Sequence, residues 1–174
     1  MKETIQHRTL SVLVENSAGV LTRISGLFSR RGYNIISLAV GETQEHSLSR
    51  MTIIVECGER FLEQIMQQLK KQVCVRTVEV LEPSRSIRRE LILIKVAASA
   101  ETRTQIIEIA NIFRAHIIDV SPGSLTLEIT GEADKADAIV EMLTGYGIME
   151  IVRTGAVALE RGAGTIYDVD RVEL

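Results

Sequence analysis

The sequence predicts an α+β protein in which one order of elements, βαββαβ, occurs twice along the chain. Residues 10–81 alternate short apolar segments of period two with two segments of helical periodicity, and residues 90–159 repeat that order. Between them, Pro83 and Ser84 introduce a strongly polar stretch that is typical of a domain boundary. We therefore expect two ferredoxin-like modules, 1–82 and 83–174.

The first module begins with a strand over residues 10–14 and a helix that ends near Gly32, with basic residues in its last turn. Strands are expected over 34–40 and 49–56, with a polar loop between them, and a valine-rich strand over 73–81 follows a second helix. The apolar stripes of the two helices are expected to face the core and consist of Val20, Leu21, Ile24, Leu27 and Phe28, and of Phe61, Leu62, Ile65, Met66 and Leu69.

The second module is expected to contain strands over 90–97, 116–121, 124–130 and 148–159. Its helices are expected over 101–115 and 134–146. Right-handed crossovers place both helices of such a module on one face of a four-stranded antiparallel sheet. The other face and the two edges remain bare, and half-apolar strands are not stable in that state. We therefore expect dimerisation through the sheet, most simply with a second copy of the chain.

Composition narrows the function classes. The chain has 174 residues, of which 45% are hydrophobic and 25% charged, which suits packed domains. A net charge of −3 and 3% aromatic residues give no case for nucleic acid or an anionic membrane surface. The N-terminus lacks the apolar core of a signal peptide, and no apolar run approaches the roughly 18 residues of a membrane span. A cytoplasmic protein is expected.

No group of residues has the spacing of a catalytic or metal centre. Cys57 and Cys74 lack CxxC spacing, so two buried thiols are favoured, with a disulfide as the alternative. His7, His46 and His116 lie far apart without a neighbouring ligand, so no metal site is expected. Phosphate-binding glycine loops and a nucleophile elbow are absent from the sequence. We expect no catalytic residues and no cofactor held by this chain.

The turn that joins the first strand to the first helix, Glu15–Gly19, carries the functional signal. A helix N-terminus presents unpaired N–H groups and the positive end of the helix dipole, which suit a small carboxylate. Asn16 offers an amide with both a donor and an acceptor, although a helix cap is its commoner role. Gly19 allows close approach to the backbone, and Asn34, at the next strand, could come from a neighbouring chain. These residues indicate an amino-acid-binding site, with Val20, Leu21 and Ile35 as its apolar niche.

Two sequence blocks resemble one family. The first, LSVLVENSAGVLTRISGLFSRRGYNIISL followed by LSRMTI, is similar to ACT domains, which bind amino acids to regulate metabolic enzymes. The second contains RELILIKV, IFRAHIIDVSPGSLTLEITG and EIVRTGAVALERG. In this order they resemble the small regulatory subunit of acetolactate synthase over residues 9–162. The tail 163–174 has no counterpart in that resemblance and is left unassigned.

The resemblance implies a function. Family members are not enzymes themselves, but activate a large catalytic subunit that holds thiamine diphosphate, FAD and Mg²⁺ and condenses two pyruvates, or pyruvate and 2-oxobutyrate. They also confer feedback inhibition by valine in branched-chain amino acid synthesis. The implied effector site lies between two chains, and the family's effector positions match Asn16, Gly19 and Val20 of one chain and Asn34 and Ile35 of the other. The predicted site also includes the neighbouring residues Ser17, Ala18 and Leu21. Which branched-chain amino acid binds best stays open.

Two other functions remain as alternatives at this stage. One is a free-standing amino-acid sensor that controls transcription or another enzyme, although the absence of a basic patch argues against direct DNA binding. The other is a small enzyme on a ferredoxin-like scaffold, which the fold alone never excludes.

Overall fold

The computed structural model describes residues 5–168 and divides into two compact units. The first unit contains the chain up to Ile87 together with the residues from Ala156 onward, and the second is Arg88–Gly155. The sequence placed the first division at 82/83 and gave the first module no C-terminal segment. The chain therefore passes between the units twice, at 87/88 and at 155/156.

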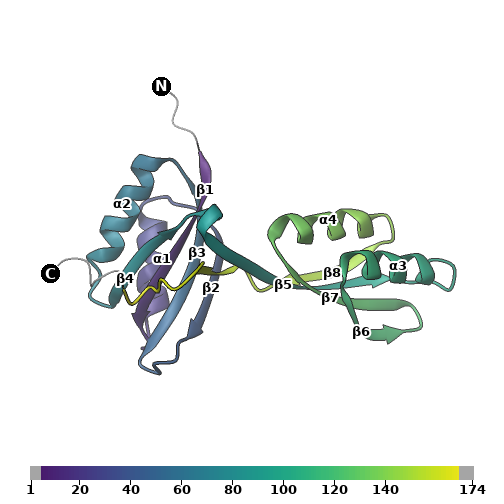
Figure 1. Ribbon diagram of the computed structural model, residues 1–174. Helices are drawn as coiled ribbons and strands as arrows, with labels where there is room; N and C mark the ends of the chain where they lie inside the picture. Colours follow the sequence, from purple (N-terminus) through teal and green to yellow (C-terminus); the bar gives the residue numbers. More distant parts are fainter. Residues whose placement is uncertain (1–4, 169–174) are drawn as a thin grey trace. The chain divides into compact units, whose positions relative to one another are not determined.

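The first unit has the expected βαββαβ order (Figure 1). Its sheet is antiparallel, with strand order β2-β3-β1-β4, so that β2 and β4 form the edges. A 3₁₀ turn, η1, follows the last strand at the polar break. The elements are β1 Gln6–Glu15, α1 Val20–Arg30, β2 Ile35–Glu42, β3 Leu48–Cys57, α2 Glu59–Lys70, β4 Val75–Leu81 and η1 Pro83–Arg85.

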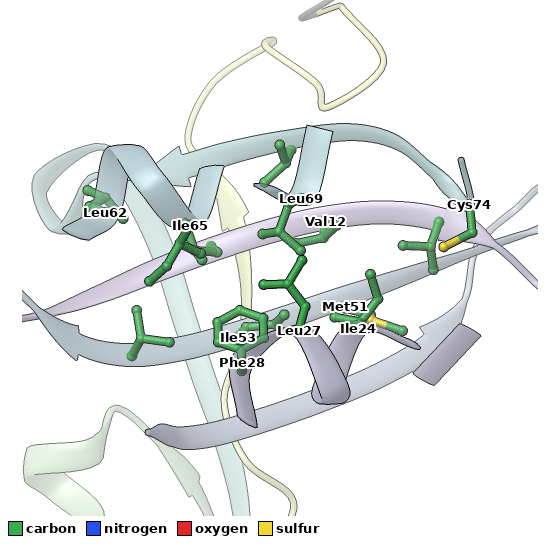
Figure 2. Packing of buried hydrophobic residues seen from close by; sticks show 14 of the residues in the cluster. Val12, Ile24, Leu27, Phe28, Met51, Ile53, Leu62, Ile65, Leu69 and Cys74 are labelled. Carbon is green, nitrogen blue, oxygen red and sulfur yellow. The ribbon is translucent and has the colours of Figure 1, made fainter. Parts of the chain in front are cut away.

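The core of the first unit lies between the sheet and its two helices. Figure 2 shows side chains of α1 and α2, among them Phe28 and Ile65, packed against Val12 and Ile53 of the sheet. Burying one such aliphatic or aromatic side chain contributes about 1.5–3 kcal/mol. Both cysteines are buried free thiols, as the spacing favoured. Two stripe positions were predicted wrongly: Leu21 and Phe61 are each 48% exposed, because each lies at the border of its helix's apolar face.

The opposite face of the first sheet is covered by the chain's own C-terminal part, here named the returning segment, residues 156–168. Because side chains alternate along a strand, Leu13 points away from the helices that Val12 and Val14 face. Leu13 packs instead with Leu48 and Ile166, which is 2% exposed. The returning segment, yellow in Figure 1, also forms β9 Val157–Glu160, which pairs with β5.

The second unit repeats the βαββαβ order. Its antiparallel sheet has strand order β6-β7-β5-β8, and α3 and α4 cover one of its faces (Figure 1). The elements are β5 Ser86–Ala97, which begins in the first unit, α3 Arg103–Phe113, β6 His116–Ser121, β7 Ser124–Gly131, α4 Ala133–Thr144 and β8 Ile148–Arg153. The predicted single strand over 148–159 is wrong, because the chain leaves the sheet after Arg153 and β9 belongs to the first unit.

Candidate effector site

The turn before α1 leaves the N-terminus of that helix without a side-chain cap. Gly19 is the N-cap residue, with a left-handed φ of 84°, and no side chain bonds to the first turn. A Cβ at Gly19 would meet nothing within 4 Å, so the space over the helix end is open. The N–H of Val20 donates to Ser17 O at 3.4 Å, so the next N–H groups of the first turn and the positive end of the dipole are the groups that an anion can use.

The structure excludes the alternative interpretation of Asn16 as a helix cap. Its backbone N–H donates to the carbonyl oxygen of Ser47 at 2.7 Å, and its Nδ2 donates to that of His46 at 3.0 Å. These bonds fix the turn to the loop between β2 and β3. With the amide nitrogen engaged, the amide oxygen of Asn16 is the part of the side chain that can accept from an ammonium group.

The other predicted residues of the turn differ in exposure. Ser17 and Ala18 are exposed beside Asn16. Val20 is 5% exposed and faces the core, so a ligand can reach only its backbone. Leu21, the next residue, presents about half of its side chain to the surface.

Asn34 and Ile35 lie at the other end of α1 within the same chain. Asn34 is exposed immediately before β2, and Ile35 is partly buried against the core. Helix α1 has 11 residues and rises about 1.5 Å per residue, so roughly 15 Å of helix separates its N-terminus from its C-terminal end. A single chain therefore does not bring Asn34 together with Asn16 around one small ligand.

A cavity of about 540 Å³ opens beside Asn16, on the side of the returning segment. Glu15 and Arg76 form an ion pair at 3.1 Å in its wall. The sequence gave no signal for this cavity, because its lining brings together distant parts of the first module and Tyr167 of the unassigned tail. Its lining consists of Leu13, Glu15, Asn16, Ser17, Glu45, Ser47, Leu48, Arg76, Thr77 and Tyr167.

A partly buried ion pair lies on the covered face of the first sheet. Arg50 Nη2 and Glu79 Oε1 are 3.5 Å apart, with side chains 20% and 13% exposed. Burial raises the pKa of Glu79, and the charge of Arg50 opposes that shift. Burial likewise lowers the pKa of Arg50, against the attraction of Glu79. Both directions show that desolvation outweighs the mutual attraction here.

Within residues 5–168, no three His, Cys, Asp or Glu side chains are grouped so that they could hold a metal ion. Across the same stretch, no helix is long and apolar enough to cross a membrane. The uncapped helix N-terminus and the amide of Asn16 are groups that suit the carboxylate and the ammonium of a small zwitterion.

Fold and turn together define a two-module protein whose N-terminal module is an ACT domain. Residues 10–77 match the family described as the AHAS small subunit-like ACT domain, and residues 89–162 match the small subunit of acetolactate synthase. The chain is 48% identical over 158 residues to a probable acetolactate synthase small subunit of Methanothermobacter thermautotrophicus, covering 90% of this chain and 94% of that protein.

Two further similar proteins are also acetolactate synthase small subunits. The acetolactate synthase small subunit of Mycolicibacterium smegmatis is 53% identical over 154 residues, which is 88% of this chain and 91% of that one. The crystal structure of the acetolactate synthase small subunit from Thermotoga maritima superposes with a TM-score of 0.86 at 39% identity, covering 92% of this chain and all of that one. The chain belongs to the family of acetolactate synthase small subunits.

Proposed function

We propose that this protein is the non-catalytic regulatory subunit of a cytoplasmic acetolactate synthase. It activates the catalytic subunit and confers feedback inhibition by valine or another branched-chain amino acid. Thiamine diphosphate, FAD and Mg²⁺ belong to the catalytic partner. The observation that carries the effector part is the uncapped N-terminus of α1, with Gly19 in a left-handed conformation and Asn16 beside it.

Each part of the amino acid has a partner in this proposal. The effector carboxylate accepts from the backbone N–H groups of the first turn of α1. Its ammonium donates to the amide oxygen of Asn16, and its branched side chain packs on the exposed part of Leu21. A second chain supplies Asn34 and Ile35, because α1 separates these residues from the turn by roughly 15 Å in their own chain.

The homodimer forms through an edge of the first sheet. The returning segment packs on the outer face of that sheet, which favours an edge as the surface for the second copy. Strand β2 is an edge strand, and its Ile36 and Val40 are 43% and 46% exposed. Edge-to-edge pairing through β2 would bury this apolar surface and bring the Asn34 of each chain toward its neighbour.

Reconstitution of the holoenzyme tests the proposed function. The purified catalytic subunit is assayed for acetolactate formation with and without this chain, across a range of valine, leucine and isoleucine concentrations. This chain alone should form no acetolactate, should raise the rate when added, and should make that rate sensitive to at least one of the three. No activation, and no inhibition by any of them, would contradict the proposal.

A pair of substitutions at Gly19 locates the effector in the same assay. Gly19→Asn and Gly19→Asp place side chains of nearly equal size into open space, and both residues tolerate a left-handed conformation. Only the aspartate repels the effector carboxylate, so it should weaken binding at least about tenfold more than the asparagine does. Equal affinities for the two variants in calorimetry would place the effector elsewhere.

A further inference from the structure

The chain re-enters the first unit at a hydrogen bond to β2. The backbone N–H of Ala156 donates to the hydroxyl oxygen of Ser37 at 3.0 Å, across 119 positions of sequence. Ala156 is the first residue of the returning segment, and Gly155, the last residue of the second unit, has a left-handed φ of 78°. The bond therefore holds the chain at the residue where it leaves the second unit.

The backbone of β2 is irregular at this point. Ile35 pairs with Val55 and Ser37 with Ile54, so the strand contains an extra residue, Ile36, between them. A bulge of this kind bends a strand and re-aims the side chains beside it. The hydroxyl that holds Ala156 thus lies two residues after Ile35 and three after Asn34, on the strand that the proposed effector would contact.

Beyond Ala156 the returning segment is fixed to the first unit at further points. Ala158 is 4% exposed, and Arg161 donates through its backbone N–H to Arg85 O at 2.7 Å and through Nε to Ser86 O at 3.1 Å. Ser37 differs from Arg85 and Ser86, the partners of Arg161, because Ser37 lies on β2. Among these anchors, the hydroxyl of Ser37 is therefore the direct contact between β2 and the returning segment.

We propose that Ser37 is a positioning residue that couples the effector site to the chain connection at 155/156. Effector binding at the start of β2 changes the strength of the bond from Ala156, and through the covalent connection this biases the second unit. The coupling rests on the proposed function. A ligand can bias two states only as far as its contacts differ between them, so the coupling requires effector contacts at Asn34 and Ile35 that differ between the state with this bond and the state without it.

The test separates effector binding from inhibition. Ser37→Ala removes the acceptor, Ser37→Thr retains a hydroxyl, and Ser25→Ala removes a hydroxyl whose bond is local, to Thr22 O. For Ser37→Ala, the valine concentration for half-maximal inhibition of the holoenzyme should rise about two- to tenfold, the factor that one neutral hydrogen bond provides. The Kd of valine for the isolated homodimer, from calorimetry, should stay within about twofold. Ser37→Thr and Ser25→Ala should behave as the wild type.

Hydrogen exchange at the amide of Ala156 gives a second readout in the folded wild-type protein. Its protection should fall in Ser37→Ala and should change in the wild type when valine is added. Unchanged half-inhibition in Ser37→Ala would overturn the coupling, and so would a matching loss of valine binding, because Ser37 would then serve the site itself. If the wild-type holoenzyme is not inhibited by any branched-chain amino acid, the proposed function fails before the coupling is reached.

Discussion

The two units share one order of elements but differ at the outer faces of their sheets, which are the faces without helices. The outer face of the first sheet is covered, and that of the second is exposed. On the first sheet, Ser11 is 0%, Thr9 2% and Thr77 7% exposed, although all three are polar. The returning segment covers that face, and Ile166 fills the space over Leu13 and Leu48. An outer face of this kind is part of the interior of the unit.

On the second sheet the outer face stays open. Val152 of β8 is 52% exposed, and the face carries partly exposed ion pairs, Lys95 with Glu150 at 3.7 Å and His116 with Glu128 at 3.6 Å. Exposed pairs of this kind contribute little to stability, typically below about 1 kcal/mol.

The comparison shows that a bare sheet face does not by itself call for a second copy of the chain. Alternation and topology predicted that each module would bury its face most simply against a duplicate. In the first unit, the chain supplies the cover from its own C-terminal part, and β2 and β4 remain as edge strands, of which the proposed homodimer uses β2.

The largest expected effect comes from removing the residue that closes the first outer face. Ile166→Ala should lower the free energy of unfolding of the first unit by about 2–5 kcal/mol, because it leaves a cavity over Leu13 and Leu48. Val152→Ala, its counterpart on the open face of the second sheet, should cost about 0.5 kcal/mol or less. Urea unfolding of both variants measures this. Similar losses would show that the two faces are equally covered in solution.

The next effect concerns the edges of the two sheets. Ile36→Lys places a charge on the exposed edge of β2 and should weaken the homodimer at least about tenfold, because pairing there would bury the ammonium group. Ile118→Lys is the matched control. Ile118 lies on the edge strand β6 of the second sheet, and its side chain is 52% exposed. Sedimentation equilibrium gives both dissociation constants. A dimer weakened by the second variant and not by the first would place the interface on the second unit.

The smallest effect is a pH dependence from the covered face. The folded-state pKa of Glu79 lies above its ordinary value of 4.5 because burial disfavours the carboxylate. Between pH 4.5 and the folded-state pKa, the native state binds more protons at Glu79 than the unfolded state does. The contribution of Glu79 to the stability of the fold is therefore full below pH 4.5 and is lost as pH rises through the folded-state pKa. The difference in unfolding free energy between wild type and Glu79→Gln should therefore fall with rising pH. A difference that rises with pH would contradict this, because it would mean that the attraction of Arg50 for the Glu79 carboxylate outweighs the effect of burial.

The sequence predicted most of the fold because alternation and helical periodicity are local signals. It did not place the returning segment, because the apolar residues on both sides of Gly155 were interpreted as one strand over 148–159, although Gly155 has a left-handed φ of 78° and marks the break. Phe61 looked like a core position by spacing, yet it lies at the border of its helix beside Tyr33. For the site, the turn was located correctly as a helix N-terminus, whereas the contact of Ser37 joins positions 119 apart and no pattern encodes it.

The central claim is that two chains of the first unit share the effector site, and complementation tests it. Asn16→Ala and Asn34→Ala homodimers should each bind valine about tenfold or more weakly, because every site lacks one amide contact to a charged ligand. The two variants are then unfolded together in equal amounts and refolded, which makes about half of the dimers mixed. In a mixed dimer, one site lacks both amides and the other regains both.

The measurement is a calorimetric titration of the refolded mixture with valine, after native mass spectrometry has confirmed the mixed dimers. A site shared between chains predicts that about a quarter of all sites bind with near wild-type affinity. A site built within one chain predicts no recovery, because every chain carries one defect. Mixed dimers without restored binding would contradict the shared site and leave Asn34 as a residue that only precedes β2.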